Sequence, residues 1–185
     1  MDMAHCIAYR LKDQTPVELC LVGPQDRERL LNGFDRISSK TNIDRFHTFK
    51  KEFSEDEIQY LLTLDNVNQL AIGAIDCSKR SDVGIGLARY VRTEPQSEHA
   101  EVATIIIDAY QGKGLGKILY TELMKEAYRN NIRTFINFVK KDNQAMLHLL
   151  KSLAARKLFE YEHVFEFAVD LSTGLSQPDI KQEAH

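Results

Sequence analysis

Alternating apolar and polar residues predict that the chain begins with two short β-strands, at residues 6–11 and 17–22. Thr15-Pro16 predicts the turn between them. From residue 26 to residue 34 the apolar positions change to helical spacing. Ser54-Glu55-Asp56-Glu57 then has the pattern of a capping box and predicts the start of another helix. We therefore expect two helices after the first two strands.

The middle of the chain combines β-rich runs with one long amphipathic segment. Residues 69–77 and 83–91 predict a hairpin around a turn at 78–82, and residues 99–108 predict a third strand. A helix is expected from residue 115 to Asn130-Asn131, because its apolar residues recur on one face. These residues are Leu115, Ile118, Leu119, Leu123 and Ala127.

The remaining segments complete an alternation of strands and helices. Residues 134–139 predict a strand, residues 143–153 a second amphipathic helix, and residues 159–171 a closing strand or strand pair. The order of elements predicts an α/β fold with three layers, α/β/α, around a mixed and mostly antiparallel sheet. We expect one domain over residues 1–171 and a flexible, polar C-terminal tail over residues 172–185.

Charge and composition exclude some classes of partner. Lys and Arg number 24 against 27 for Asp and Glu, so the net charge of −3 provides no general positive field for nucleic acid or an anionic membrane. No apolar run approaches the roughly 20 residues of a membrane span. We expect a cytoplasmic protein that binds neither nucleic acid nor membrane.

The cysteines and histidines show no metal-binding pattern. Cys6, Cys20 and Cys77 are odd in number, widely spaced and without a C-x-x-C pair, so we expect reduced cysteines and no disulfide framework or zinc site. The histidines lack ligand spacing, and metal chemistry is not expected. His99, two residues before Glu101, is interpreted as an ordinary strand residue.

Residues 111–116, Gln-Gly-Lys-Gly-Leu-Gly, lie between the third strand and the long helix. Glycines permit unusual dihedral angles and a close ligand, and the helix start behind them presents free N–H groups, so this turn predicts an anion cradle. It is not a P-loop, because Ile118 follows Lys117, and its spacing does not fit the dinucleotide fingerprint. A purely structural turn is the alternative.

The turn resembles a family signature. Gln111, Gly114 and Gly116 fit Q/R-x-x-G-x-G/A, the pyrophosphate-binding pattern of the GNAT N-acetyltransferases. The chain is similar to the subgroup of bacterial protein lysine acetyltransferases from about residue 34 to residue 158. The segments that carry this likeness are Arg45-Phe46, residues 87–92, Ala100-Glu101-Val102-Ala103, Asp108 and residues 142–147. The resemblance implies a GNAT-like fold.

The resemblance also implies a reaction. Acetyl-CoA would donate its acetyl group to a primary amine of a protein lysine or a small molecule, leaving CoA. An amine with a pKa near roughly 10.4 must lose a proton before it attacks the thioester directly. Glu101 matches the general base of the family's A-E-F-A-V segment. Alternatively it is a solvated carboxylate, and Glu94 and Glu98 are weaker substitutes.

By the same resemblance, the cofactor-binding residues are expected on the third strand, on the glycine turn and at the start of the later helix. They are Val102, Ala103, Ile105, Ile106, Ile107, Gln111, Gly112, Lys113, Gly114, Leu115, Gly116, Lys117 and Asn143. Lys113 and Lys117 would add a local positive charge. Asn143 has two equal interpretations, a helix cap or a contact to the pantetheine arm.

Some positions depart from the family pattern and leave alternatives open. The tyrosine expected about two turns after Asn143 is replaced by Leu149 and Leu150, and an arginine three residues before Arg45 is replaced by Asn42. The acceptor therefore stays undetermined. A non-catalytic acyl-CoA-binding sensor is the alternative function, and a site for another nucleotide is a third. The sequence allows a monomer or a homodimer.

Overall fold

The computed structural model describes residues 6–79 and 83–174 and contains one eight-stranded sheet in the order β1-β2-β3-β4-β5-β6-β8-β7. All neighbouring strands are antiparallel except β5 and β6, which are parallel. The expected mixed, mostly antiparallel sheet is therefore confirmed. The strands are β1 (Ile7–Arg10), β2 (Pro16–Leu21), β3 (Gln69–Asp76), β4 (Gly84–Arg92), β5 (His99–Ile106), β6 (Thr134–Lys140), β7 (Arg156–Glu160) and β8 (Val164–Asp170).

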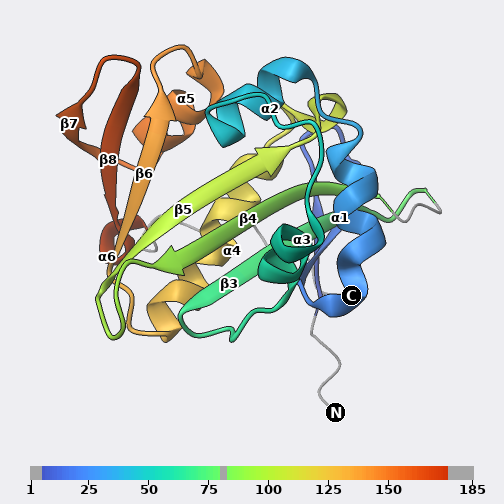
Figure 1. Cartoon of the computed structure of the whole chain (residues 1–185), viewed down its shortest axis with the longest axis horizontal. Helices are drawn as coiled ribbons and strands as arrows, with labels where there is room; N and C mark the ends of the chain where they lie inside the picture. Colours follow the sequence, from blue (N-terminus) through green and yellow to red (C-terminus); the bar gives the residue numbers. More distant parts are fainter. Residues whose placement is uncertain (1–5, 80–82, 175–185) are drawn as a thin grey trace.

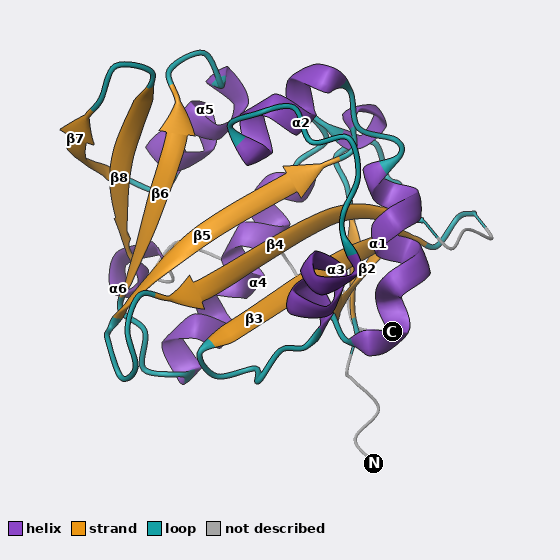
Figure 2. Ribbon diagram, in the orientation of Figure 1, coloured by secondary structure: helices purple, strands orange, loops and turns teal. Residues whose placement is uncertain are grey.

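Helices cover both faces of the sheet, which confirms the three layers (Figure 2). One face carries α1 (Arg27–Phe34), α2 (Ser39–Phe46) and α3 (Glu55–Leu62), and α4 (Leu115–Arg129) crosses the other. Helix α5 (Gln144–Ser152) follows β6, and its buried Leu150 joins the core with residues of α4. The shorter helical turns are η1 (Pro24–Asp26), η2 (Asp108–Tyr110) and α6 (Leu171–Gly174).

The main core lies between the sheet and α4. Tyr90, Tyr120 and Phe135 are fully buried there, and the ring of Phe135 lies 6.0 Å from Tyr90 and 5.7 Å from Tyr120 between centroids. The Tyr120 hydroxyl donates a hydrogen bond of 3.0 Å to Asn137 Oδ1, so a buried polar group on β6 is satisfied. This packing fixes α4, and with it the glycine turn that precedes α4.

Helix α1 lies very close to the sheet. A Cβ added at Gly33 would lie 2.5 Å from the carbonyl oxygen of Gly84 on β4, so only a glycine allows this approach. The capping box expected at Ser54 is present, and Ile58 and Leu62 are buried, as the spacing predicts. The sequence therefore identified α1 and α3.

Helix α2 is a third helix on this face, where the sequence predicted only two. Its segment carries few apolar residues, so helical periodicity was weak. Tertiary contacts hold it instead: the side chain of Asn42 donates to the carbonyl of Lys50 at 2.7 Å and accepts from the N–H of Lys50 at 2.8 Å. The residue that departs from the family pattern therefore has a structural role.

The expectation of reduced cysteines is wrong for two of the three. Cys6 and Cys20 form a disulfide between the first two strands, with Cα atoms 4.4 Å apart. Register explains the pair, because Ile7 lies opposite Leu19 and the next position brings Cys6 opposite Cys20. Cys77 is a free, exposed thiol.

The end of the chain agrees with the strand pair expected there, now seen as β7 and β8. The expected tail begins with the short helix α6, and from residue 175 it lies outside the described residues. Among the helices that the structure describes, none is long and apolar enough to cross a membrane.

Candidate active site

A cleft opens where β5 and β6 separate. Their parallel pairing is limited to three residue pairs, from His99 opposite Thr134 to Glu101 opposite Ile136, and the strands then diverge (Figure 1). From Val102 onward, the edge of β5 that faces away from β4 has no strand partner among the described strands. The cleft has a volume of about 2050 Å³. Unpaired backbone groups on such an edge can bind an extended ligand.

The glycine turn closes one end of this cleft. Gly112 and Gly114 have φ angles of +73° and +92°, in the left-handed region that favours glycine. The Gly114 carbonyl accepts the first backbone bonds of α4, from Lys117 and Ile118. Within the described part of the chain, no hydrogen bond is donated by the backbone N–H groups of residues 112–116. Free N–H groups at a helix start can bind an anion, so this geometry is compatible with the anion cradle, which stays a prediction.

Lysines add positive charge around the turn. Lys113 pairs with Asp13 at 2.9 Å, and this contact is the main cause that lowers the pKa of Asp13 to about 2. Lys12 and Lys117 line the cleft and have no ion-pair partner among the residues described. The Lys12 N–H also donates to the carbonyl of Lys113 at 3.0 Å. Lys12 was missed from the sequence because it reaches the turn only through folding.

A hydrogen-bond network, here called the α2 anchor, joins the first turn of α2 to the end of β5. Asp108 accepts from the Ser38 N–H at 2.8 Å, the Ser38 hydroxyl at 2.7 Å and the Thr41 hydroxyl at 3.0 Å. Gln111 Nε2 donates to Thr41 Oγ1 and to the Ile106 carbonyl, each at 3.0 Å. The side-chain amide of Gln111 therefore links α2 to the backbone at the end of β5.

The α2 anchor affects the ionisation of Asp108. Burial raises the pKa of this carboxyl, but the hydrogen bonds from Ser38 and Thr41 outweigh burial and hold it below its usual value. Asp108 is therefore a charged anchor at neutral pH.

Glu101 lies where the two strands part. It is the last β5 residue paired with β6, it is exposed, and its side chain lines the cleft. The carboxylate forms no hydrogen bond or ion pair with any of the described residues. Glu94 and Glu98, the weaker candidates, do not line the cleft. Of these three carboxylates, Glu101 is the one that lines the cleft and could accept a proton from a ligand there.

The structure brings most of the expected cofactor-binding residues to the cleft. Two do not line it: Leu115 is fully buried in the core, and Ile107 faces a second cavity. Asn143 lines the cleft and also caps α5, accepting from the Met146 N–H at 3.1 Å. The others that line it are Val102, Ala103, Ile105, Ile106, Gln111, Gly112, Lys113, Gly114, Gly116 and Lys117.

Thr104 is a cleft residue that the sequence did not indicate. Its hydroxyl oxygen is buried and has no hydrogen-bond partner among the described residues, although it lies on the strand edge that lines the cleft. A buried hydroxyl without a partner is unfavourable. It therefore marks a position where a ligand would supply a hydrogen bond.

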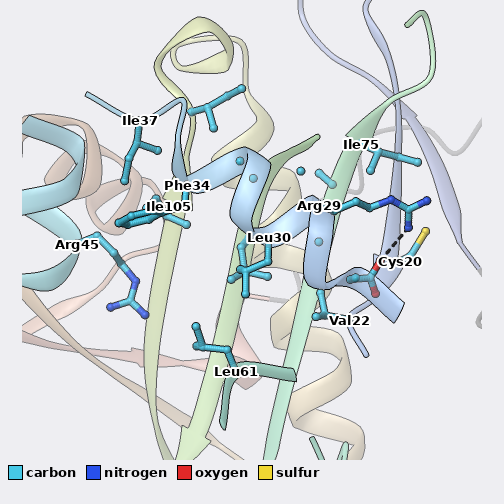
Figure 3. A pocket seen from close by; sticks show the side chains of 18 of the residues that line it. Cys20, Val22, Arg29, Leu30, Phe34, Ile37, Arg45, Leu61, Ile75 and Ile105 are labelled. Atoms are coloured by element: carbon cyan, nitrogen blue, oxygen red, sulfur yellow. Dashed lines mark hydrogen bonds and ion pairs between the residues drawn. The ribbon is translucent and has the colours of Figure 1, made fainter. Parts of the chain in front are cut away.

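The second cavity, of about 100 Å³, lies beneath α1 (Figure 3). Its walls are mainly apolar, with Leu30 and Phe34 from α1, Leu61 from α3 and Ile105 from β5. Arg45 of α2 lines both this cavity and the cleft. It therefore connects the two spaces.

Comparison with known proteins decides the family. Residues 29–154 match the family model described as the Acetyltransferase (GNAT) family. The chain belongs to this family. In this GNAT protein the matched residues include all of α2, β5, α4, β6 and α5, the elements that line most of the cleft.

Individual GNAT relatives agree. The chain is 32% identical over 139 residues to acetyltransferase Pat of Mycolicibacterium smegmatis, which covers 71% of this chain and 39% of that protein. The chain therefore spans well under half of that relative. The crystal structure of the GNAT domain of S. lividans PAT has a TM-score of 0.82 at 20% identity, covering 89% of this chain and 96% of that one.

A third comparison concerns a ligand-bound structure. A spermidine N-acetyltransferase from Vibrio cholerae, in complex with CoA and spermine, has a TM-score of 0.66 at 19% identity, covering 86% of this chain and 98% of that one. The predicted GNAT fold and the likeness to bacterial protein lysine acetyltransferase domains are thus confirmed.

Proposed function

We propose that this GNAT protein is an N-acetyltransferase that moves the acetyl group of acetyl-CoA to a primary amine, with Glu101 as general base. The observation that carries the proposal is the position of Glu101. It stands at the closed end of the unpaired β5 edge, whose other end leads to the glycine turn. One cleft therefore joins an anion cradle to an unpaired carboxylate.

The residues of the cleft fit CoA. The free N–H groups of residues 112–116, with Lys12 and Lys117, suit a pyrophosphate. The unpaired edge of β5 suits the amides of a pantetheine arm, and the Thr104 hydroxyl lacks the partner that such an amide would provide. When bound, acetyl-CoA supplies the thioester carbonyl that the amine attacks. The spermidine N-acetyltransferase of Vibrio cholerae, which has a similar fold, is likewise in complex with CoA.

The proposed step balances in atoms and charge. The amine nitrogen forms a bond to the acetyl carbon, the C–S bond breaks, and CoA leaves as a thiolate. Glu101 accepts the proton that the amine loses, directly or through one water. Thiols have a pKa near roughly 8.5, so the thiolate is a tolerable leaving group and solvent can protonate it. This accounts for leucines on α5 at the position of the expected tyrosine.

Two acceptor classes remain compatible with this step. A protein lysine agrees with the resemblance to bacterial protein lysine acetyltransferases, and a small amine agrees with the open cleft. A non-catalytic acyl-CoA sensor is the competing function, and it requires only the glycine turn and the β5 edge. The role of Glu101 separates the enzyme from the sensor.

The test is Glu101→Gln, which preserves size and removes the base. We expect acetyl transfer, followed as thiol release over a panel of lysine proteins, polyamines and amino acids, to fall by about 10²–10⁴-fold near neutral pH. CoA affinity, measured by calorimetry, should stay unchanged. Glu98→Gln is the matched control, because Glu98 is exposed just before β5 and does not line the cleft, and it should retain activity.

Three outcomes would contradict the proposal. Equal turnover by wild type and Glu101→Gln would remove Glu101 as the base. CoA binding without turnover on any acceptor would favour the sensor. Binding of ATP in preference to CoA would refute the assignment of the cofactor.

A further inference from the structure

Arg45, near the end of α2, is a cation with no ion-pair partner among the described residues. Its guanidinium lies 5.0 Å from the ring centroid of Phe46, and it forms no hydrogen bond or ion pair within residues 6–79 and 83–174. Figure 3 shows this side chain at the edge of the cavity beneath α1, with no dashed contact to another residue drawn. Because Arg45 also lines the cleft, a ligand there can reach it.

The surroundings of Arg45 are unfavourable for a cation. Burial, together with the charge of Arg89, lowers the pKa of Arg45 to about 10. Arg89 on β4 is only 5% exposed, and its hydrogen bonds go to neutral groups, Gln69 Oε1 at 2.7 Å and the Tyr60 carbonyl at 3.4 Å. The Arg89 Nε atom has no partner among the described residues. Two cations thus lie close together, and neither forms an ion pair with a described carboxylate.

Arg45 is on the same side of the sheet as Glu101. Arg89 lies opposite Ala103 in the β4–β5 register, and Glu101 is two residues before Ala103, so these side chains share one sheet face. This is the face that carries α1, α2 and α3. Arg45 and Glu101 both line the cleft, and the small side chain of Ala103 leaves room on that face. The cleft therefore presents the Glu101 carboxylate and the Arg45 guanidinium on the same face of the sheet.

The cofactor cradle is at the other end of α2. The α2 anchor ties the first turn of the helix to the residues around the glycine turn. Arg45 lies six residues after Ser39, which corresponds to roughly 9 Å along a helix. Arg45 is therefore displaced from the site that suits the pyrophosphate.

We propose that Arg45 binds a carboxylate of the acceptor, so that the acceptor is a small amine of the amino acid class. This inference rests on the proposed acetyl transfer and specifies its acceptor. A guanidinium binds a carboxylate through two parallel hydrogen bonds, and Glu101 receives the amine of the same molecule. The half-buried position of Arg45 beside a cavity of about 100 Å³ favours a small ligand over a protein surface.

The test compares each L-amino acid with its α-amide, because the two differ in the carboxylate alone. We expect wild-type kcat/KM to be about tenfold or more higher for the acid than for the amide, since a site built for a hydrogen-bonded group rejects the analogue without it. In Arg45→Met this preference should disappear, through a higher KM for the acid and an unchanged KM for the amide. Arg45→Lys should retain part of it.

Stability provides an independent readout. Methionine has a similar reach and no charge, so Arg45→Met removes the repulsion from Arg89 and should leave the thermal midpoint equal or raise it. Arg36→Met is the matched control: Arg36 is exposed on the turn between α1 and α2, and its loss should change neither the preference nor the midpoint. A lower midpoint in Arg45→Met would show a structural role and overturn the inference.

The remaining outcomes separate the inference from the function. Equal transfer to acids and amides, or transfer to lysine peptides alone, would overturn the amino acid class while acetyl transfer stands. Transfer to amide acceptors is also compared with succinyl-CoA and acetyl-CoA as donors. If Arg45→Met lowers only the transfer from succinyl-CoA, Arg45 binds a carboxylate of the acyl chain, and the inference is overturned. Absence of transfer to every acceptor would instead remove the proposed function itself.

Discussion

The two ends of α2 meet different halves of the candidate active site. At its first turn, Ser38, Thr41, Asp108 and Gln111 satisfy one another in the α2 anchor. Near its last turn, Arg45 has no hydrogen-bonding partner among the described residues. This helix has only eight residues. It thus connects a hydrogen-bond network that is complete without a ligand to a charged side chain that has no partner without one.

This difference suits the two molecules that the cleft is proposed to bind. In this proposal the first turn of α2 lies at the cofactor end, where one constant ligand would bind to backbone groups that a self-satisfied network keeps in place. The last turn lies at the acceptor end, where the ligand would bind to side chains that lack partners among the described residues. Unpaired charge is unfavourable in a folded chain, so its presence indicates a ligand rather than stability.

Among the variants that test the difference between the two ends of α2, the one that strains the glycine turn should have the largest effect. Gly114→Ala places a Cβ at a φ of +92°, which costs about 1–2 kcal/mol, so CoA affinity should fall by about tenfold or more in calorimetry. Gly116→Ala is the control, since its Cβ would meet only side-chain ends, Ile106 at 3.1 Å and Leu149 at 4.0 Å. Equal losses in both variants would show that close ligand approach, rather than the dihedral angle, governs the turn.

A smaller effect should come from the α2 anchor. Asp108→Asn weakens hydrogen bonds that are donated to a charged carboxylate, and we expect about 1–2 kcal/mol less stability in urea unfolding at pH 7. Because the folded pKa is lowered, this contribution is fully present above the usual carboxyl pKa of about 3.9 and is lost as the pH falls through the folded value.

The difference in free energy of unfolding between wild type and Asp108→Asn should therefore become smaller at acidic pH. Asp35→Asn, an exposed carboxylate on the turn after α1, serves as the control and should behave as wild type. If the difference in free energy of unfolding stays constant from pH 7 to pH 3, the charge of the Asp108 carboxylate does not stabilise the α2 anchor.

The smallest effect should come from Asn143→Ala, which decides between the two interpretations of this residue. Loss of the bond to the Met146 N–H should cost about 1 kcal/mol or less of stability and leave CoA affinity unchanged. Calorimetry and thermal unfolding of the same variant measure both quantities. A clear loss of CoA affinity would instead give Asn143 a place in the cofactor site.

The strand, glycine turn and helix at the proposed cofactor end were predictable because their signals are local. They are continuous in sequence, so spacing alone indicated a turn at residues 111–116 between β5 and α4. The capping box at Ser54 and the cap at Asn143 are also short-range patterns. Local chemistry fixes each of these features, and tertiary contacts reinforce them.

Helix α2 and the surroundings of Arg45 were not predictable, because they depend on contacts between residues far apart in sequence. Helix α2 depends on the contact of Asn42 with Lys50, and the unfavourable closeness of Arg45 to Arg89 arises only when a helix packs on a distant strand. Lys12 reaches the glycine turn only when the sheet forms. The Cys6–Cys20 disulfide likewise depends on strand register, which spacing between cysteines did not reveal.

The short pairing of β5 with β6 divides the backbone hydrogen bonding of the sheet into two parts. Strands β1 to β5 form one part and β6, β8 and β7 the other, and only three residue pairs of backbone ladder connect them. Both parts nevertheless share one hydrophobic core, because Phe135 of β6 packs against Tyr90 of β4 and Tyr120 of α4. The molecule therefore keeps an open strand edge inside a continuous core.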